Sequence, residues 1–469
     1  MDLFQKLFGV KDHEGKAIPT PELKDIYKKT INIAWPSTVE GALTAIIGSV
    51  DTMMVGTLGA AAIAAVGLTG QPRMIMYVFA QAMCVGTTAL CARRKGAGDQ
   101  KSANSCLNQS LGVVTLLGIL MTMIGWFGAE GLMKLGGANE DTLAMSTMYF
   151  RIISLSFLPN CWNMCICAAM RAIGKTRVTM VTNMTANLVN VVLNYILING
   201  KLGFPALGVK GAAIATVCGI CVASCISLSI IIRKGGYYHL SLPRFDRVTL
   251  DGLTKVGGSS MVESVCLRLG FLILARLIAG IGTNAFAAYQ IVSQVTSLSF
   301  TLGDGVSTGG TSLVGQSLGA KRKDRAMAHA NVAYRIGIFV SLGLMLVIFL
   351  FRRQIALLFT TDEEIIRGVT ASLYVCILAM MPQNGRVIAS GALRGAGDVK
   401  FVAYCALLSV AILRPVLTWV FCYPVASMLP DMQIAVMGPW IAFLIDAIVR
   451  DRLLTYRLKQ GKWMDIKLS

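Results

Sequence analysis

Charged side chains are scarce in this sequence. Asp, Glu, Lys and Arg make up 14% of its 469 residues, and 55% are hydrophobic. In a soluble domain about 25% of the residues are charged. The shortage extends over the whole chain, which excludes an ordinary soluble protein and predicts one that crosses a membrane several times. The net charge of +19 does not predict a nucleic-acid partner, because the basic residues stand in short connections between apolar runs.

Residue patterns typical of catalytic or metal sites are also scarce in this chain. Its three histidines lie in tails, loops or at a helix end, and no spacing of Cys and His suits zinc. The 13 cysteines lie almost entirely in or beside apolar runs, where free thiols pack as small hydrophobic groups. No HExxH motif and no matched catalytic pair occurs. We therefore expect no enzyme, and no cofactor apart from a transported coupling ion.

Twelve apolar runs are each long enough to cross a bilayer, which takes about 20 residues. Runs of this length must be helices, because every backbone polar group has to be satisfied inside the segment. The predicted spans are 31–55, 67–92, 109–129, 146–170, 178–199, 207–232, 253–279, 286–314, 329–351, 366–391, 402–424 and 434–456.

Lys and Arg residues concentrate in alternate connections between these runs. The first thirty residues are polar and show no cleavable signal peptide. Basic connections face the cytoplasm, so we expect a multi-pass protein of the cell (inner or plasma) membrane with both termini in the cytoplasm. The basic connections are 93–101, 171–177, 233–255, 321–325 and 394–400.

The second half of the chain repeats the first at one offset of 223 residues. Glu40 falls on Glu263, Gln71 on Gln294, and other Gly, Ala, Pro and Arg residues match without a gap. Six spans per half give parallel repeats, and transporters of this kind bind substrate between the halves. The predicted fold class is an all-α polytopic membrane protein with twelve transmembrane helices, in two parallel six-helix lobes around a central cleft.

The repeat also predicts the domain boundaries. These are a cytoplasmic N-terminal segment 1–30, an N-lobe 31–232, a cytoplasmic linker 233–252, a C-lobe 253–456 and a cytoplasmic tail 457–469.

Seven motifs in a fixed order resemble the multidrug and toxic compound extrusion (MATE) family, closest to its DinF-like branch, over essentially the whole chain. The resemblance implies a two-lobed, twelve-helix transporter that exports substrates by alternating access, driven by H⁺ or Na⁺. The motifs are "WPSTVEGALTAIIGSVDTMMVGTLGAAAIAAVGL" (35–68), "GTTALCARRKGAGD" (86–99), "MRAIGKTR" (170–177), "LGVKGAAIAT" (207–216), "GQSLGAKRKDRA" (315–326), "ALRGAGD" (392–398) and "RLKQGKW" (457–463).

Asp51 stands inside the first predicted span. A carboxylate at membrane depth costs about 2.5–3.5 kcal/mol, so it is expected to face the bundle interior and to be functional. A helix-end cap or an interhelical hydrogen bond is the structural alternative. The resemblance implies that Asp51 binds the coupling ion, because the matching aspartate of the family is its coupling-ion site.

Polar neighbours for Asp51 are expected on the fifth span. Asn187, Asn190 and Asn194 recur at spacings of three and four, so they share one helix face and need partners inside the bundle. Relatives often have Asp where this chain has Asn194. One carboxylate with amide oxygens, and Thr216 in addition, could hold Na⁺ or a single proton, so both ions remain open.

A second set of polar residues suggests a substrate path. Repeat symmetry places Glu40 and Glu263 at equivalent positions toward a cleft, where they could recognise cationic substrates or be neutralised by arginines within or near the spans. Asp446 and Arg450 are spaced as a structural pair, and Pro36 could let the first helix bend. The cleft candidates are Glu40, Glu263, Gln81, Asp304, Arg268, Gln71 and Gln294.

The favoured function is a monomeric secondary transporter that exports amphipathic, cationic organic compounds in exchange for H⁺ or Na⁺. Its partners would be a small-molecule substrate and membrane lipid. The alternative is a flippase for a lipid or lipid-linked substrate. A flippase should show a strongly basic cavity or extra helices, whereas the cleft candidates here are mixed in sign.

Overall fold

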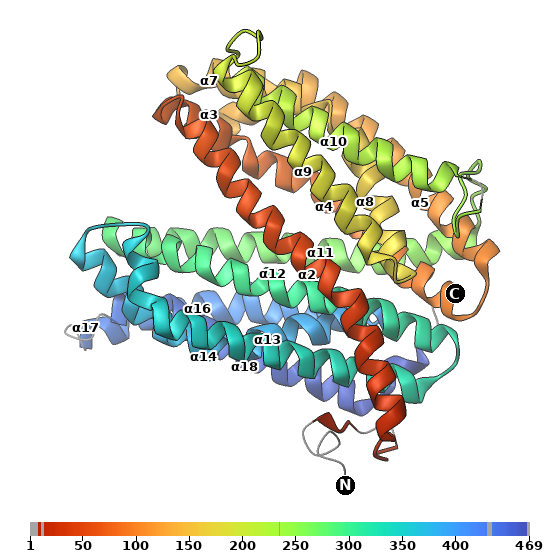
Figure 1. Ribbon diagram of the computed structural model, residues 1–469. Helices are drawn as coiled ribbons and strands as arrows, with labels where there is room; N and C mark the ends of the chain where they lie inside the picture. Colours follow the sequence, from red (N-terminus) through yellow and green to blue (C-terminus); the bar gives the residue numbers. More distant parts are fainter. Residues whose placement is uncertain (1–7, 11–13, 234, 429–433, 467–469) are drawn as a thin grey trace. The chain divides into compact units, whose positions relative to one another are not determined.

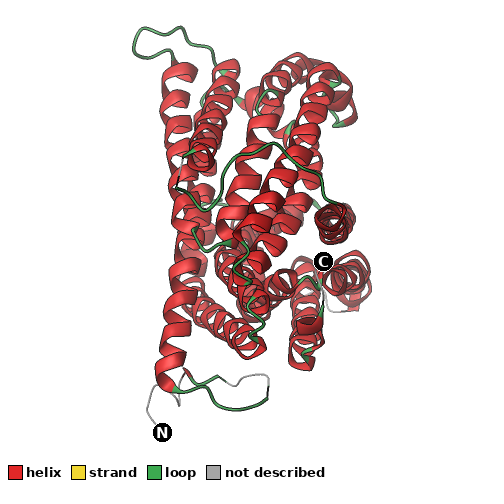
Figure 2. Cartoon of the chain, turned by 90° about the vertical axis from the view of Figure 1, so that its right-hand side faces the viewer, coloured by secondary structure: helices red, strands yellow, loops and turns green. Residues whose placement is uncertain are grey.

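The structure is a computed structural model that describes residues 8–10, 14–233, 235–428 and 434–466. Within these residues it is helical and has no β-strand (Figure 2). The chain divides into two compact units: an N-unit of residues 39–258 and a C-unit of residues 1–38 and 259–468. The outer ends of the predicted N-terminal segment and tail lie outside the described residues.

The N-unit begins within the first long helix, α2 (Thr20–Gly56). Helices α4, α5 and α10 all pack on α8, and α9 lies beside α10 (Figure 1). The remaining helices of this unit are α3 (Ala60–Leu68), α4 (Gly70–Gly96), α5 (Gln100–Phe127), α6 (Ala129–Leu135), α7 (Glu140–Ser154), α8 (Phe157–Ala172), α9 (Thr176–Asn199) and α10 (Val209–Ile232).

The C-unit is organised around α14, on which α12, α13 and α18 pack (Figure 1). Its helical segments are α11 (Arg247–Ala279, from residue 259 onward), α12 (Thr283–Gly319), α13 (Lys323–Leu357), α14 (Glu363–Ala396), α15 (Val399–Ala406), the π-helical η1 (Leu407–Leu413), α16 (Arg414–Val420), the π-helical η2 (Phe421–Val425), α17 (Ala426–Met428), α18 (Ile434–Gln460) and the 3₁₀ turn η4 (Lys462–Asp465).

Each of the twelve predicted spans falls on a helical segment. In the described part of the chain, eight helices are long and apolar enough to cross a membrane, or nine if the bent pair α7–α8 counts as one span. The other three predicted spans lie in α11, α12 and α18, which have 33, 37 and 27 residues but carry more polar side chains. The predicted all-α polytopic fold class is confirmed.

Two spans are less regular than predicted. Span 146–170 is two helices, α7 and α8, bent by 48° between them, although its repeat counterpart α14 is a single helix. Span 402–424 contains the two π-helical segments η1 and η2. Pro415 and Pro424 lie at these segments, and proline lacks the N–H that a regular α-helical turn requires.

The compact units do not end where the predicted lobes end. Both boundaries fall inside a helix: one between residues 38 and 39 in α2, the other between 258 and 259 in α11. The beginning of α2 therefore packs within the C-unit. Gly305 of α12 permits this close approach, because a Cβ atom there would overlap the backbone of Thr38. The predicted N-terminal segment already contains the start of α2, at Thr20.

Candidate functional site

Helices α2 and α9 of the N-unit share a row of polar contacts. The amide of Asn183 donates to Glu40 at 2.6 Å, Asn187 to the Thr44 hydroxyl at 3.3 Å, and Asn194 to Asp51 at 2.9 Å. In each pair the two residues are 143 positions apart. A constant separation along both helices means that α2 and α9 run in the same direction with these faces together.

Asp51 lies at one end of this row. Asn190 and Asn194 are buried, with 7% and 2% of their surface exposed. With its nitrogen toward Asp51, the Asn190 amide donates to the two carboxylate oxygens at 2.8 and 3.0 Å, and its oxygen accepts from the Thr216 hydroxyl at 3.3 Å. The structure therefore brings together the four predicted coupling residues Asp51, Asn190, Asn194 and Thr216.

The orientation of the Asn190 amide is tied to the protonation state of Asp51. An ionised carboxylate only accepts hydrogen bonds, so it selects the orientation above. In the opposite orientation Asn190 donates to the Thr216 hydroxyl at 3.3 Å, and its oxygen faces the carboxyl group, where a protonated Asp51 can donate. Rotation of this amide exchanges a donor for an acceptor beside the carboxyl group of Asp51.

Sodium binding makes a different demand on the same residues. A hard cation takes oxygen ligands, and here the oxygens available are those of Asp51, Thr216 and the two amides. The side-chain oxygen of Asn194 is buried and has no hydrogen-bond partner, so it is an available ligand. For both amides to offer oxygen to a cation beside Asp51, however, their nitrogens would have to turn away from the carboxylate. Among the described residues Asp51 forms no ion pair.

Glu40 and Glu263 are both buried, and each pairs inside its own unit. Glu40, 8% exposed, accepts from Arg171 at 3.2 Å, and Glu263, 3% exposed, accepts from Arg394 at 2.7 Å. Both pairs span 131 residues, so the repeat extends to the ion pair itself. The sequence pattern places Arg171 and Arg394 in basic connections between spans, whereas the structure places them in the last turns of α8 and α14. Their recurrence at the repeat offset is the signal that indicates the pairing.

The surroundings of the two glutamates differ. Around Glu40, Thr179 donates to the carboxylate at 3.2 Å, and Asn183 connects it to Asn163 at 3.1 Å and onward to Ser227 at 2.6 Å. Glu263 instead accepts from a second arginine, Arg450, at 3.3 Å. Asp446 and Arg450 form no direct ion pair with each other: Arg450 pairs with Glu263, and Asp446 accepts from the Ser409 hydroxyl.

Within the described part of the chain, Gln71, Gln81 and Gln294 form no hydrogen bond with Glu40 or Glu263. The part of the cleft candidates in a substrate path stays a prediction, as does bending at Pro36, which is buried inside the continuous helix α2. The exposed candidates are Gln71, Gln81, Arg268, Gln294 and Asp304.

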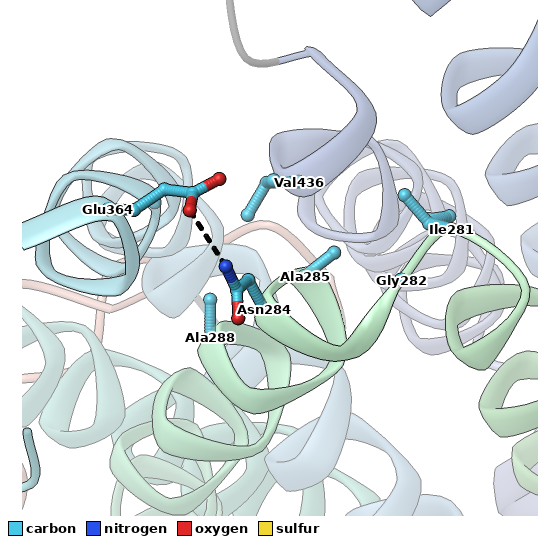
Figure 3. Close-up of a pocket in the computed structure, with 8 residues that line it drawn as sticks. Ile281, Gly282, Asn284, Ala285, Ala288, Glu364 and Val436 are labelled. Carbon is cyan, nitrogen blue, oxygen red and sulfur yellow. Dashed lines mark hydrogen bonds between the residues drawn. The ribbon is translucent and has the colours of Figure 1, made fainter. Parts of the chain in front are cut away.

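A cavity of about 540 Å³ lies at one end of the C-unit, apart from all these residues. Figure 3 shows the Asn284 amide directed toward Glu364, to which it donates at 2.7 Å. The other labelled lining residues, among them Ala285 and Ala288, are apolar. This cavity contains none of the predicted site residues, and it combines one carboxylate with an apolar wall.

The chain matches the family model described as MatE twice, over residues 36–196 and 259–420. The two matches begin 223 residues apart, which is the offset of the internal repeat.

Curated relatives match over most of their length. The chain is 28% identical over 453 residues to "Probable multidrug resistance protein NorM" of Thermotoga maritima, covering 95% of each chain. It is 29% identical over 382 residues to "Multidrug resistance protein PmpM" of Pseudomonas aeruginosa, covering 80% of this chain and 79% of the relative. A solved outward-facing multidrug resistance MATE transporter matches with a TM-score of 0.85 at 22% identity, over 93% of this chain and 97% of that one.

Proposed function

The chain belongs to the MATE family of multi-pass membrane transporters, and on that premise we propose that it exports amphipathic, cationic organic compounds by alternating access, in exchange for H⁺ or Na⁺. One observation carries the coupling role: the Asp51 carboxylate stands within a membrane-spanning helix, held by the amides of Asn190 and Asn194 and without an ion-pair partner among the described residues. Multidrug resistance relatives support the substrate class.

Binding of a cation at Asp51 changes the contacts between α2 and α9. While Asp51 is ionised, both amides donate to it and tie the two helices together. A bound proton or Na⁺ removes the net charge and at least one of these hydrogen bonds, so the helices can separate more easily. This change biases an equilibrium between two conformations by the difference in ion affinity of the two states. Solved MATE structures have been described in a straight and in a bent conformation.

We also propose that both termini and the connection between α10 and α11 face the cytoplasm of the cell in which the protein is made, with the protein in its cell membrane. The support is the concentration of Lys and Arg on that side of the helices.

The decisive experiment measures export of a fluorescent organic cation by the purified protein in liposomes. We expect Asp51→Asn to reduce gradient-driven transport to the level seen without a gradient, because the variant cannot exchange a cation at this site. A pH gradient without Na⁺ and a Na⁺ gradient without a pH difference, imposed separately, identify the coupling ion.

Glu130→Gln serves as the matched control, because it removes one carboxylate that is exposed and paired with Lys134. It should transport like the wild type. If Asp51→Asn still exports the cation at the wild-type rate under either gradient, the proposed coupling role is wrong.

A further inference from the structure

The segment between α10 and α11 is fixed to the start of α5 by its backbone. The N–H groups of His239, Ser241 and Asp246 donate to the side-chain oxygens of Asn104, Asn108 and Gln109, at 2.7, 3.0 and 3.1 Å. Arg94 adds a hydrogen bond of 2.7 Å to the Thr249 hydroxyl. The segment is therefore a preformed surface and not a loose connection.

A cavity of about 350 Å³ opens between this segment and α5. Two of its lining residues, Lys101 and Arg244, are exposed cations, and among the described residues neither forms an ion pair. The nearby carboxylate of Asp246 is turned to the first turn of α11, and the backbone N–H of Thr249 lowers the pKa of Asp246. The lining consists of Lys101, Asn104, Ser105, Asn108, Ser241, Leu242 and Arg244.

With the predicted span 109–129 placed in the bilayer, this cavity comes at the level of the lipid headgroups. Residues 108–127 of α5 cover about 30 Å at 1.5 Å per residue, which is the thickness of the hydrocarbon core. Residues 101–108 then extend into the headgroup region. The apolar face that follows along the helix is open, with Leu116, Leu120 and Met123 more than half exposed, and Leu242 at the cavity is 90% exposed.

The same place in the other repeat is closed. At the 223-residue offset Lys101 corresponds to Asp324, which pairs with Arg322 at 2.6 Å. Ser105 corresponds to Ala328, which is buried in an apolar cluster with Ile18 and Val332, and Ile18 is the counterpart of Ser241. The fold therefore does not require a basic cavity at this position.

We propose that this cavity binds the phosphate headgroup of an anionic membrane lipid. Lys101 and Arg244 neutralise the phosphate, the Ser105 hydroxyl lies within the same lining, and an acyl chain follows the exposed apolar face of α5. Basic pockets at the cytoplasmic ends of membrane helices bind anionic headgroups in this way. A free phosphate ion would satisfy the two cations but would leave Leu242 and the apolar face of α5 unused.

The test uses the purified full-length protein in phosphatidylcholine micelles, titrated with phosphatidylglycerol. Bound lipid is counted by native mass spectrometry, and the thermal unfolding midpoint is followed in parallel. We expect the double variant Lys101→Gln/Arg244→Gln to bind phosphatidylglycerol about 30-fold more weakly, since each cation near an anionic surface contributes about 1 kcal/mol. Leu242→Gln, which leaves the charge unchanged, should weaken binding by a smaller factor.

The matched control is Lys201→Gln/Lys210→Gln, which removes two exposed lysines, one just after the end of α9 and one in the first turn of α10. It should bind phosphatidylglycerol like the wild type. The proposal is overturned if Lys101→Gln/Arg244→Gln retains wild-type binding, or if both double variants lose binding equally. It is also overturned if inorganic phosphate alone reproduces the stabilisation and Leu242→Gln has no effect, because the ligand would then be a free anion.

Discussion

Glu40 in the N-unit and Glu263 in the C-unit occupy equivalent positions, yet different chemistry surrounds them. Glu40 has one arginine and a chain of neutral partners that reaches Asn163 and Ser227. At the 223-residue offset Asn163 becomes Arg386 and Ser227 becomes Arg450, so the C-unit places additional arginines where the N-unit has an amide and a hydroxyl. Both repeats contain the carboxylate–arginine pair, and they differ in the charge of the side chains around it.

A second difference follows along the same helices. Asp51, Asn190 and Asn194 fall on Leu274, Leu413 and Leu417, and Leu274 is only 1% exposed. The repeat thus keeps a polar row in one half and apolar packing in the other. Under the proposed function, ion binding would belong to the N-unit alone.

The largest effect is expected from neutralising the two glutamates separately. Glu263→Gln leaves Arg450, whose side chain is 3% exposed, without its carboxylate, whereas Glu40→Gln leaves Arg171, which is 32% exposed and can reach water. Breaking a buried pair costs about 3–5 kcal/mol, and we expect that loss for Glu263→Gln. For Glu40→Gln we expect a smaller loss of about 1–3 kcal/mol, because Arg171 can reach water and the new amide keeps part of the hydrogen bonding around the buried side chain. Unfolding in detergent measures the loss of stability of both variants. Equal losses would contradict the predicted difference between the two glutamates.

An intermediate effect concerns helix packing. Gly395 of α14 touches α12 so closely that a Cβ atom would overlap the carbonyl oxygen of Thr311 and lie 2.9 Å from its Cα. Its counterpart in α8 is Ala172. We expect Gly395→Ala to destabilise the protein by about 1–3 kcal/mol through overpacking. Ala172→Gly should cost only the helix propensity of about 1 kcal/mol and any lost packing.

Thermal unfolding of the two variants, with Ala396→Gly as a second alanine-to-glycine control in α14, separates packing from propensity. A stabilising Gly395→Ala would show that α12 and α14 can move apart without cost.

The smallest effect is expected at the middle of the polar row. Asn187→Val converts this position to its counterpart, Val410, and removes one exposed hydrogen bond of 3.3 Å. We expect the free energy of unfolding to change by no more than about 0.5 kcal/mol.

The comparison variant is Asn183→Ala, which likewise introduces the counterpart residue, Ala406. It removes the 2.6 Å contact to buried Glu40 and should lower the free energy of unfolding by about 1–3 kcal/mol. Equal losses of stability at the two positions would mean that burial does not determine how much each contact of the row contributes.

The sequence predicts the helical fold and the repeat because both depend on patterns that recur along the chain. The hydrophobic runs mark the spans, and a single offset connects Glu40 with Glu263. The Asn stripe also indicates the face of α9 that meets Asp51, since three amides on one apolar helix need partners. These features are determined by local composition and periodicity.

Partners that come from distant helices were harder to infer. Arg171 and Arg394 recur at the repeat offset, yet basic residues at helix ends also set membrane orientation, and that explanation was sufficient without a pairing. Asp446 and Arg450 lie one helical turn apart, but Glu263 of another helix takes Arg450. The bend between α7 and α8 has no counterpart in α14 although both contain a proline at the matching position. At the break, the Ser154 and Ser156 hydroxyls donate to backbone carbonyls of α7 and so favour a bend, whereas α14 has Ile377 and Ala379 there.

The division of α2 between the two units affects how the protein is made. Glu22 contacts Arg325, 303 residues later, and Thr30 lies 3.4 Å from His329, 299 residues later. A ribosome adds about 5–20 residues per second, so the first turns of α2 wait on the order of 15–60 s for their partners. During synthesis the residues of the N-unit are complete at position 258, before the partners of the first turns of α2 have been made.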